Sequence, residues 1–227
     1  MFFSNCNLSC IFCQNYPISQ LGNGYKVSVR ELSEIMIELQ GKGVHNINLV
    51  TPTHVIPYIV YAFFEAKEKG LKIPLVYNCG GYESIETLKL LKGIIDIYLP
   101  DAKYSNDEDS LKCSGVKNYF KINRVALKEM YDQAGNLVLD KYGIAKKGLI
   151  IRHLVLPQDL SGTKHVLEFI SNSICKDTYL SLMSQYHPAH KVVNAKELSK
   201  KITKKAYNSA LETANELGLT NGWKQDL

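Results

Sequence analysis

Short apolar runs rich in β-branched residues recur along the chain and predict a set of β-strands. The runs are apolar on both faces, as expected of strands that helices cover on both sides of a sheet. Five of them span residues 46–50, 73–78, 95–99, 148–156 and 178–183. A sixth, truncated strand is predicted at Phe2-Phe3-Ser4, where the sequence starts.

Longer segments with the hydrophobic period of an α-helix separate these runs. Several of the segments end in glycine, which commonly terminates helices because it adopts a left-handed backbone without strain. They span residues 30–43, 55–70, 84–93, 120–135 and 163–173. A lysine-rich helix is predicted to follow, at roughly 195–217.

Strands that alternate with helices predict an α/β protein built on a parallel sheet, either a barrel or an open doubly wound sheet. A complete eightfold barrel usually takes ~250 residues. Six units in 227 residues therefore predict a partial (β/α)6 barrel of the TIM type, with its first strand truncated. No linker, repeat or low-complexity stretch interrupts the chain, which indicates one domain over residues 1–227. In either architecture ligands bind at the carboxyl ends of the strands, so the residues that follow each strand are the candidates for function.

The composition argues against nucleic acid as a partner. Hydrophobic residues make up 45% and charged residues 22% of the chain, which is ordinary for a folded, soluble protein. The formal net charge of +5 comes almost entirely from lysine, and only three arginines are present. Proteins that read nucleic acids usually rely on arginine for bidentate contacts to bases and phosphates.

Membrane insertion and secretion are not expected either. No apolar run approaches the ~20 residues that cross a bilayer. The opening "MFFSNC" lacks the basic region and the long apolar core of a signal peptide. The cysteines beyond residue 13 are scattered and do not resemble a disulfide framework, so we predict a reducing, cytoplasmic setting.

Three cysteines follow the first predicted strand: Cys6, Cys10 and Cys13, spaced C-x3-C-x2-C in "CNLSCIFC". A structural zinc site usually takes four protein ligands in a closed tetrahedron, and no fourth thiol lies nearby in the sequence. Three thiolates on one loop can instead hold three corners of a [4Fe–4S] cluster and leave its fourth iron open. The spacing favours the cluster. The alternative is a zinc site completed by a distant cysteine or histidine.

Polar residues also follow the second, third and fourth strands. Thr51 and Thr53, in "TPTH", offer hydroxyl groups to a ligand, although Thr53 as the cap of the next helix is the simpler interpretation. Asn78 begins "NCGG", whose glycines permit either close approach to a ligand or an ordinary turn. Asp101 and Lys103 can bond a ribose or a carboxylate, or form a solvated surface pair.

The last two strands carry further candidates. Arg152 lies within an apolar strand, where a buried guanidinium needs an anionic partner. That partner is either a ligand carboxylate or an internal acid. After the sixth strand, Tyr186 and His187 can stack on a base or simply cover the end of the barrel.

In this order, the motifs resemble the radical S-adenosylmethionine (radical SAM) superfamily. The cysteine spacing, with aromatic Phe12 before the last cysteine, is specific to that superfamily, and the resemblance extends over essentially the whole chain. It is strongest toward a branch related to pyruvate formate-lyase activating enzymes. The segments that carry it are "FFSNCNLSCIFCQNY", "INLVTPTH", "YNCGGYE", "IDIYLPDAKY", "IRHLVLP" and "MSQYHP". The resemblance implies a single radical SAM core domain over residues 1–227.

The resemblance implies two cofactors, a [4Fe–4S] cluster and S-adenosylmethionine. Cys6, Cys10 and Cys13 would ligate the cluster, and the amino and carboxylate groups of S-adenosylmethionine would chelate its open iron. Phe12 would lie near the adenine and contribute mainly backbone contacts.

The threonine motif and "NCGG" depart from the family pattern. "TPTH" occupies the place of a glycine-glycine-glutamate motif that receives the methionine amino group in many relatives, which makes Thr51 and Thr53 candidate cofactor ligands. At "NCGG" the activating enzymes carry Asp-Thr-Asn-Gly. Asn78 and Cys79 replace its acid and threonine here, and the lost negative charge weakens any cation site at that position.

The candidates on the last three predicted strands match the activating enzymes more closely. Asp101 and Lys103 match an Asp-x-Lys near the cofactor. Arg152 matches an arginine that pairs with the cofactor carboxylate, which would explain a guanidinium within an apolar strand. His187 matches a histidine near the adenine. All four are therefore expected to bind the cofactor.

The implied activity is radical chemistry. A reduced cluster would pass one electron to S-adenosylmethionine, which would cleave to methionine and a 5′-deoxyadenosyl radical that abstracts hydrogen from a substrate. The substrate would be a glycyl radical protein or a small molecule, and the electron donor flavodoxin or ferredoxin. A truncated, non-catalytic iron–sulfur or zinc protein is the alternative, because the first strand is so short. Arg152, Asp101 and Lys103 argue against it, since a bare metal site needs no cofactor-binding rim.

Overall fold

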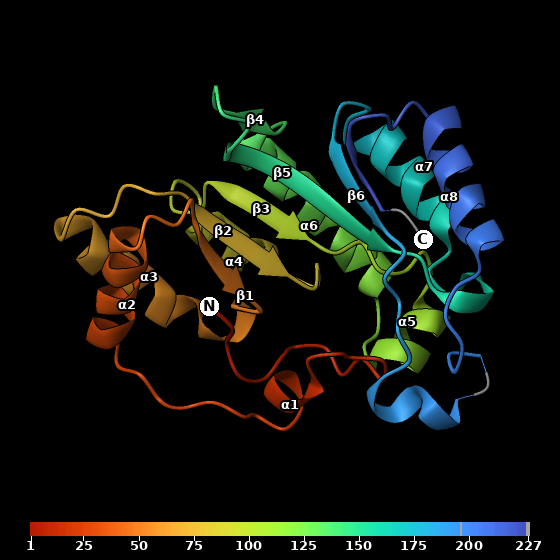
Figure 1. Cartoon of the computed structure of the whole chain (residues 1–227), viewed down its shortest axis with the longest axis horizontal. Helices are drawn as coiled ribbons and strands as arrows, with labels where there is room; N and C mark the ends of the chain where they lie inside the picture. Colours follow the sequence, from red (N-terminus) through yellow and green to blue (C-terminus); the bar gives the residue numbers. More distant parts are fainter. Residues whose placement is uncertain (196, 226–227) are drawn as a thin grey trace.

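A parallel β-sheet, open at both edges, forms the centre of the protein (Figure 1). The computed structural model describes residues 1–195 and 197–225. The strands of the sheet are β1 (Ile47–Val50), β2 (Leu75–Cys79), β3 (Ile97–Pro100), β5 (Ala145–Leu154), β6 (Tyr179–Met183) and β7 (Gly222–Lys224), hydrogen-bonded in that order. A short strand, β4 (Val138–Leu139), pairs antiparallel with β5. The predicted fold class, an α/β protein on a parallel and incomplete barrel, is confirmed.

Helices connect the strands and cover the sheet. They are α1 (Tyr16–Ser19), α2 (Val29–Gly41), α3 (Ile56–Glu68), α4 (Ile85–Leu90), α5 (Asp107–Ser114), α6 (Tyr119–Ala134), α7 (Thr163–Ser173) and α8 (Lys204–Glu216). Helix α2 packs against α3, α6 packs against β3 and β5, and α7 packs against α8. Figure 1 shows α2 and α3 beside the β1 edge, and α7 and α8 beyond β6 at the opposite end.

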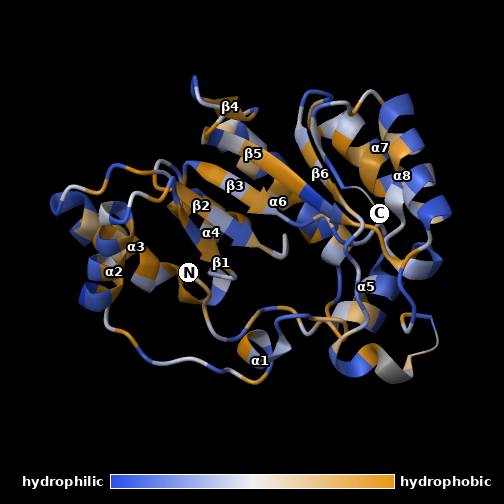
Figure 2. Cartoon of the chain, viewed as in Figure 1, coloured by the Kyte–Doolittle hydropathy of each residue, from blue (hydrophilic) through white to orange (hydrophobic). Residues whose placement is uncertain are grey.

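Hydrophobic burial explains this arrangement. All five residues of β2 are buried, as expected of a strand covered on both faces. Figure 2 shows apolar residues concentrated on the central strands, whereas α8 is mostly hydrophilic. Helix α8 buries only one stripe, formed by Tyr207, Ala210 and Ala214, which is the pattern of an amphipathic surface helix. None of the helices within residues 1–195 and 197–225 has the length and apolar character needed to cross a membrane.

Some elements differ from the sequence prediction. The predicted first strand is reduced to a single bridge between Phe2 and Val50. Helix α5 was not predicted because its sequence, "DEDSLKCS", lacks a clear apolar period; the Asn106 side chain caps it by accepting from the Asp109 N–H. The terminal helix is shorter than predicted, since α8 begins only at Lys204. Residue 196, within the predicted helix, lies outside the described residues.

The edge strand β7 was also not predicted, because three residues containing a glycine give no strand signal. It pairs in parallel with β6, with Gly222 opposite Leu180. At Gly222 the backbone has φ +153°, and a β-carbon there would collide with the Leu180 carbonyl oxygen. Glycine therefore permits the close approach that adds this strand to the sheet.

The register of the sheet brings the carboxyl ends of the strands into line. Val50 of β1 lies opposite Asn78, and Cys79 lies opposite Pro100. The residue after β3, Asp101, forms an isolated bridge with Arg152 of β5. Residues far apart in sequence therefore meet at one end of the sheet, as a parallel topology requires.

Candidate functional site

A cavity of about 490 Å³ opens at the carboxyl ends of β1, β2, β3 and β5. Eight of the residues predicted to bind cofactors line it: Cys6, Cys10, Cys13, Thr51, Asn78, Asp101, Lys103 and Arg152. They come from the cysteine loop and from four strand ends, so the fold collects them from across the first 152 residues. The walls between them include Asn48, Cys79 and Gly80.

The cysteine loop is anchored from a distant part of the chain. The Ser9 amide donates to the Ser114 carbonyl and the Ile11 amide donates to the Cys113 carbonyl, each at 2.9 Å. The Cys10 thiol is buried and hydrogen-bonded to the Ser114 hydroxyl at 2.9 Å. These contacts with the end of α5 fix the middle of the loop against the core.

The three thiols face one cavity but do not converge. The Cys13 thiol is hydrogen-bonded to the Ser19 hydroxyl at 3.1 Å, and the Cys6 sulfur accepts from the Leu8 amide at 3.4 Å. Within the described residues, no three cysteine, histidine or acidic side chains are grouped closely enough to hold a metal ion. Burial raises the pKa of Cys6 to about 11 and also raises the pKa of Cys10. A metal that bound them would have to displace these protons, as metals do at thiolate sites.

Asp101 is held between two cations. Its Oδ1 lies 2.8 Å from Arg152 Nη2, and its Oδ2 lies 2.7 Å from Lys103 Nζ. The three side chains are only 15%, 25% and 17% exposed, respectively. Burial alone would raise the pKa of Asp101, but Arg152 and then Lys103 outweigh it and hold the pKa below its ordinary value. One of the two partners left open by the sequence, an internal acid, is therefore paired with Arg152.

Two unpaired polar atoms remain at the cavity. The Arg152 Nε–H donor and the Asn48 Oδ1 acceptor are buried, and no hydrogen-bond partner is found for either among the described residues. Both residues line the cavity. Buried polar groups are nearly always paired, so each calls for a partner of opposite character. A carboxylate and an ammonium on one ligand would supply both, and S-adenosylmethionine carries both groups. The three thiols line the same cavity. These thiols and the two unpaired polar atoms together fit the two cofactors.

Three predicted residues lie outside this cavity. Phe12 is buried and packs edge-to-face on Tyr186, with ring centroids 5.9 Å apart. Thr53 lies in a 3-10 turn (Thr53–Val55), where it does not cap a helix through its side chain; its hydroxyl donates to Glu83 Oε1 at 2.9 Å. His187 lines a second, neighbouring pocket.

Glu83 is a buried acid that the sequence analysis missed. It is 2% exposed and accepts hydrogen bonds from the Tyr77 hydroxyl at 2.7 Å and from Thr53. Thr53 follows Thr51, whose φ of +59° is unusual for a β-branched residue. The Glu83–Thr53 bond therefore braces a strained segment that carries Thr51 to the cavity wall. The signal in the sequence was a lone acid directly after "NCGGY".

His153, next to Arg152 in β5, was also missed. It is fully buried, and its Nδ1–H donates to the Ala102 carbonyl at 2.6 Å. Its Nε2 lies 3.0 Å from the Thr163 hydroxyl. Burial lowers the pKa of His153 to about 4, so the ring is neutral near pH 7. It ties β5 to the segment after β3 and so fixes the spacing of Asp101 and Arg152.

We expect the substitution Glu83→Gln to stabilise the protein at high pH. Burial raises the pKa of Glu83 to about 7 from an ordinary value of 4.5, so the folded state holds a proton that the unfolded state has released. This contribution to stability is complete below the unfolded pKa and is lost as the pH rises through the folded pKa. The loss is about 3 kcal/mol between pH ~4.5 and ~7.

The measurement is urea unfolding of both proteins at several pH values. His153 has a lowered pKa and contributes the opposite slope, but it is present in both proteins and cancels in their difference. The free energy of unfolding of Glu83→Gln relative to wild type should rise with pH across this window. The exposed Glu86→Gln on α4 is the control, and a flat difference for Glu83→Gln would show that Glu83 is ionised in the folded protein.

Comparisons with known proteins identify the family of this chain. The family model described as the radical SAM superfamily matches residues 1–170. An uncharacterized protein of Methanocaldococcus jannaschii is 30% identical over an alignment of 232 residues, which covers 96% of this chain and 62% of that protein. The chain therefore spans less than two thirds of the length of this curated relative.

Solved structures share the fold at low sequence identity. SuiB of Streptococcus suis, bound to S-adenosylmethionine, has a TM-score of 0.66 and 12% identity, covering 99% of this chain and 49% of that one. Methylornithine synthase has a TM-score of 0.62 and 16% identity, covering 94% and 61%. HydG, a maturase of the [FeFe]-hydrogenase, has a TM-score of 0.62 and 12% identity, covering 99% and 52%.

The match over residues 1–170 decides the family, and the structural likeness agrees with it. Enzymes of this family use a [4Fe–4S] cluster and S-adenosylmethionine, the two cofactors that the cavity fits. The chain belongs to the radical SAM superfamily.

Proposed function

We propose that this chain binds a [4Fe–4S] cluster and S-adenosylmethionine in the cavity at the carboxyl ends of β1 to β5, and that it catalyses hydrogen abstraction from a substrate. The observation that carries the proposal is the cavity itself. Cys6, Cys10 and Cys13 line it together with Arg152 and Asp101. A bare metal site would need only the three thiols.

In this proposal, different groups of residues bind different parts of the two cofactors. Cys6, Cys10 and Cys13 ligate the cluster as thiolates. Arg152 offers its unpaired Nε–H to the carboxylate of the cofactor, and Asn48 offers its unpaired carbonyl oxygen to the ammonium. Thr51, Asn78, Asp101 and Lys103 bound the remaining space. Phe12 and His187 lie outside this cavity, and the sequence resemblance supports a place for both near the adenine of the cofactor.

Bound together and reduced, the two cofactors supply a carbon-centred radical strong enough to abstract hydrogen. The residues of this chain supply position and shielding. Asp101 holds Arg152 and Lys103 in fixed geometry, so their donors are set before the cofactor arrives. The apolar side chains of Leu8 and Ile18 line the same cavity and exclude water from the reacting atoms.

The test is the production of 5′-deoxyadenosine. Protein purified without oxygen and reconstituted with iron and sulfide would be reduced with dithionite and given S-adenosylmethionine. We expect release of 5′-deoxyadenosine and methionine in equal amounts. A bound cluster without cleavage would instead support the non-catalytic iron–sulfur alternative, and zinc in place of iron would contradict the cofactor assignment.

The proposal extends to the substrate, the electron donor with its cellular setting, and the domain organisation. The sequence resemblance to pyruvate formate-lyase activating enzymes supports a glycine residue of a partner protein as the hydrogen donor, with a small molecule as the alternative. Flavodoxin or ferredoxin would supply the electron, in a cytoplasmic setting. Residues 1–227 would act as a single core domain. Incubation with a candidate glycyl radical protein, followed by electron paramagnetic resonance, tests the first of these.

A further inference from the structure

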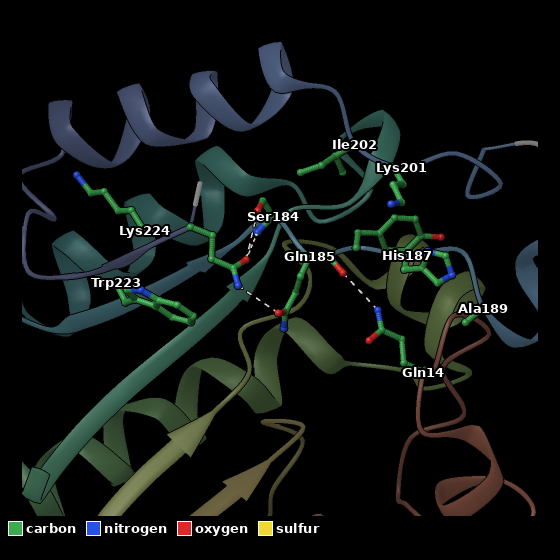
Figure 3. A pocket seen from close by; sticks show the side chains of 11 residues that line it. Gln14, Ser184, Gln185, His187, Ala189, Lys201, Ile202, Trp223 and Lys224 are labelled. Atoms are coloured by element: carbon green, nitrogen blue, oxygen red, sulfur yellow. Dashed lines mark hydrogen bonds between the residues drawn. The ribbon is translucent and has the colours of Figure 1, made fainter. Parts of the chain in front are cut away.

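A second pocket, of about 910 Å³, lies at the carboxyl ends of β6 and β7 (Figure 3). Its lining residues include Gln14, Gln185, His187, Lys201, Trp223 and Lys224. No aspartate or glutamate among the described residues lines it, although the chain carries 22 acidic residues. Every ionisable side chain that could carry charge in this pocket near neutral pH is therefore basic.

The pocket adjoins the cysteine loop. Gln14 directly follows Cys13, which lines the first cavity, and its Nε2 donates to the Gln185 carbonyl at 3.3 Å (Figure 3). The edge-to-face contact between Phe12 and Tyr186 lies on the same boundary. A molecule in this pocket would therefore sit next to the loop that we propose holds the cluster.

The floor of the pocket is already built by hydrogen bonds. Gln225 accepts from the Ser184 amide at 2.8 Å, and its Nε2 donates to Gln185 Oε1 at 3.1 Å. The Lys224 ammonium is committed elsewhere, since it donates to Asn215 Oδ1 at 2.9 Å. The side chains of Gln225, Gln185 and Lys224 are therefore held in place by hydrogen bonds.

Two lining groups are uncommitted. No hydrogen bond or ion pair to another described residue holds the Lys201 ammonium, and Figure 3 shows this side chain on the same side of the pocket as His187. Trp223 lies on the other side, 58% exposed, and its ring stacks on no aromatic side chain in the described part of the chain. A large exposed indole and an uncompensated cation that face one pocket from opposite sides can bind a planar, anionic molecule.

We propose that this pocket binds the substrate and that it favours the small-molecule alternative over a glycyl radical protein: a small molecule with a planar group and an anionic oxygen group, either a carboxylate or a phosphate. Lys201 receives the anion, and Trp223 stacks on the planar part. The inference rests on the proposed function, because it takes the adjoining cavity as the source of the radical. A solvated lysine alone would not support this inference. The support comes from the lack of acidic residues among the described lining residues and from the exposed, unstacked ring of Trp223.

The chain provides its own reporter for a test. Trp223 is its only tryptophan, so fluorescence excited at wavelengths that tryptophan but not tyrosine absorbs reports on this side chain. The full chain is titrated with benzoate, with phenyl phosphate and with neutral benzamide, which has nearly the shape of benzoate. We expect saturable changes with one or both anions and binding at least ~10-fold weaker for benzamide, the loss of one charge-assisted contact. The stronger of the two anions identifies the carboxylate or the phosphate as the recognised group.

Two variants decide which residues carry the effect. Lys201→Ala should weaken binding of the preferred anion by ~10-fold, whereas Lys205→Ala, on the surface of α8 and outside the pocket, should not change it. Equal binding of benzamide and benzoate, or an unchanged affinity in Lys201→Ala, would overturn the charge recognition. No fluorescence change with any probe would overturn the pocket itself. Because these titrations need neither reduction nor S-adenosylmethionine, their failure is distinct from a failure to form 5′-deoxyadenosine.

Discussion

Replacement of Cys10 by alanine is expected to abolish cluster binding and with it all 5′-deoxyadenosine formation. Cys10 is the middle ligand of the proposed set and is the most buried of the three thiols, held at 2.9 Å from Ser114. Loss of a residue that only orients a metal ligand already costs ~10–100-fold in affinity, so loss of the ligand itself should cost more. Iron content and the brown absorption of the protein purified without oxygen measure the effect.

Cys175→Ala is the matched control for this experiment. Cys175 lies beyond α7 and does not line the cavity, so that variant should keep its iron and its colour. Unfolding by urea should show that both variants remain folded. If Cys10→Ala kept the iron content of wild type, the assignment of this cysteine as a ligand would be wrong.

Replacement of Arg152 by alanine is expected to weaken S-adenosylmethionine binding at least ~30-fold while leaving the cluster in place. The variant removes the unpaired Nε–H that we assign to the cofactor carboxylate. It also leaves Asp101 with Lys103 as its one remaining cationic partner among the described residues. Because the pair is partly exposed, the accompanying loss of stability should be smaller than for a fully buried pair, about 1–3 kcal/mol.

Equilibrium dialysis with S-adenosylmethionine separates binding from stability in this variant. Arg124→Ala is the control, since Arg124 stacks on Phe120 and Phe169 away from the cavity. Arg152→Lys adds a second comparison: it keeps the charge beside Asp101 but loses the planar fork. We expect it to recover the stability and only part of the binding. Full binding by Arg152→Ala would refute the carboxylate pairing.

The sequence predicts that the polar residues near the strand ends meet in space, because parallel strands end at one edge of a sheet. Asp101 and Arg152 lie 51 positions apart, yet Asp101 follows one apolar run and Arg152 lies within another, and the register places them side by side. The identity of the Arg152 partner could not be predicted. A guanidinium in an apolar strand requires an anion, but the pattern does not say whether the anion is internal.

Other features left no periodic signal in the sequence. Glu83 contacts Thr53 across 30 positions, and that contact depends on how two loops fold over the ends of β1 and β2. His187 follows the sixth strand as predicted, yet it lines a neighbouring pocket; the chain just beyond it meets the cysteine loop, where the Lys191 amide donates to the Ile11 carbonyl. The three residues of β7 pair with β6 only because Gly222 lets two backbones approach. These outcomes depend on tertiary packing, which local patterns do not encode.

The anchoring of the cysteine loop has a consequence for how the protein is made. The loop is synthesised before the residues that anchor it, because its backbone bonds lead to Cys113 and Ser114 and the Cys10–Ser114 contact spans 104 residues. Closing so long a loop carries an entropic cost that local contacts within the first turns do not offset. Ser114 must therefore leave the ribosome before Cys10 has a fixed place, so the arrangement of the three thiols that we propose for the cluster is completed only after this distant contact forms.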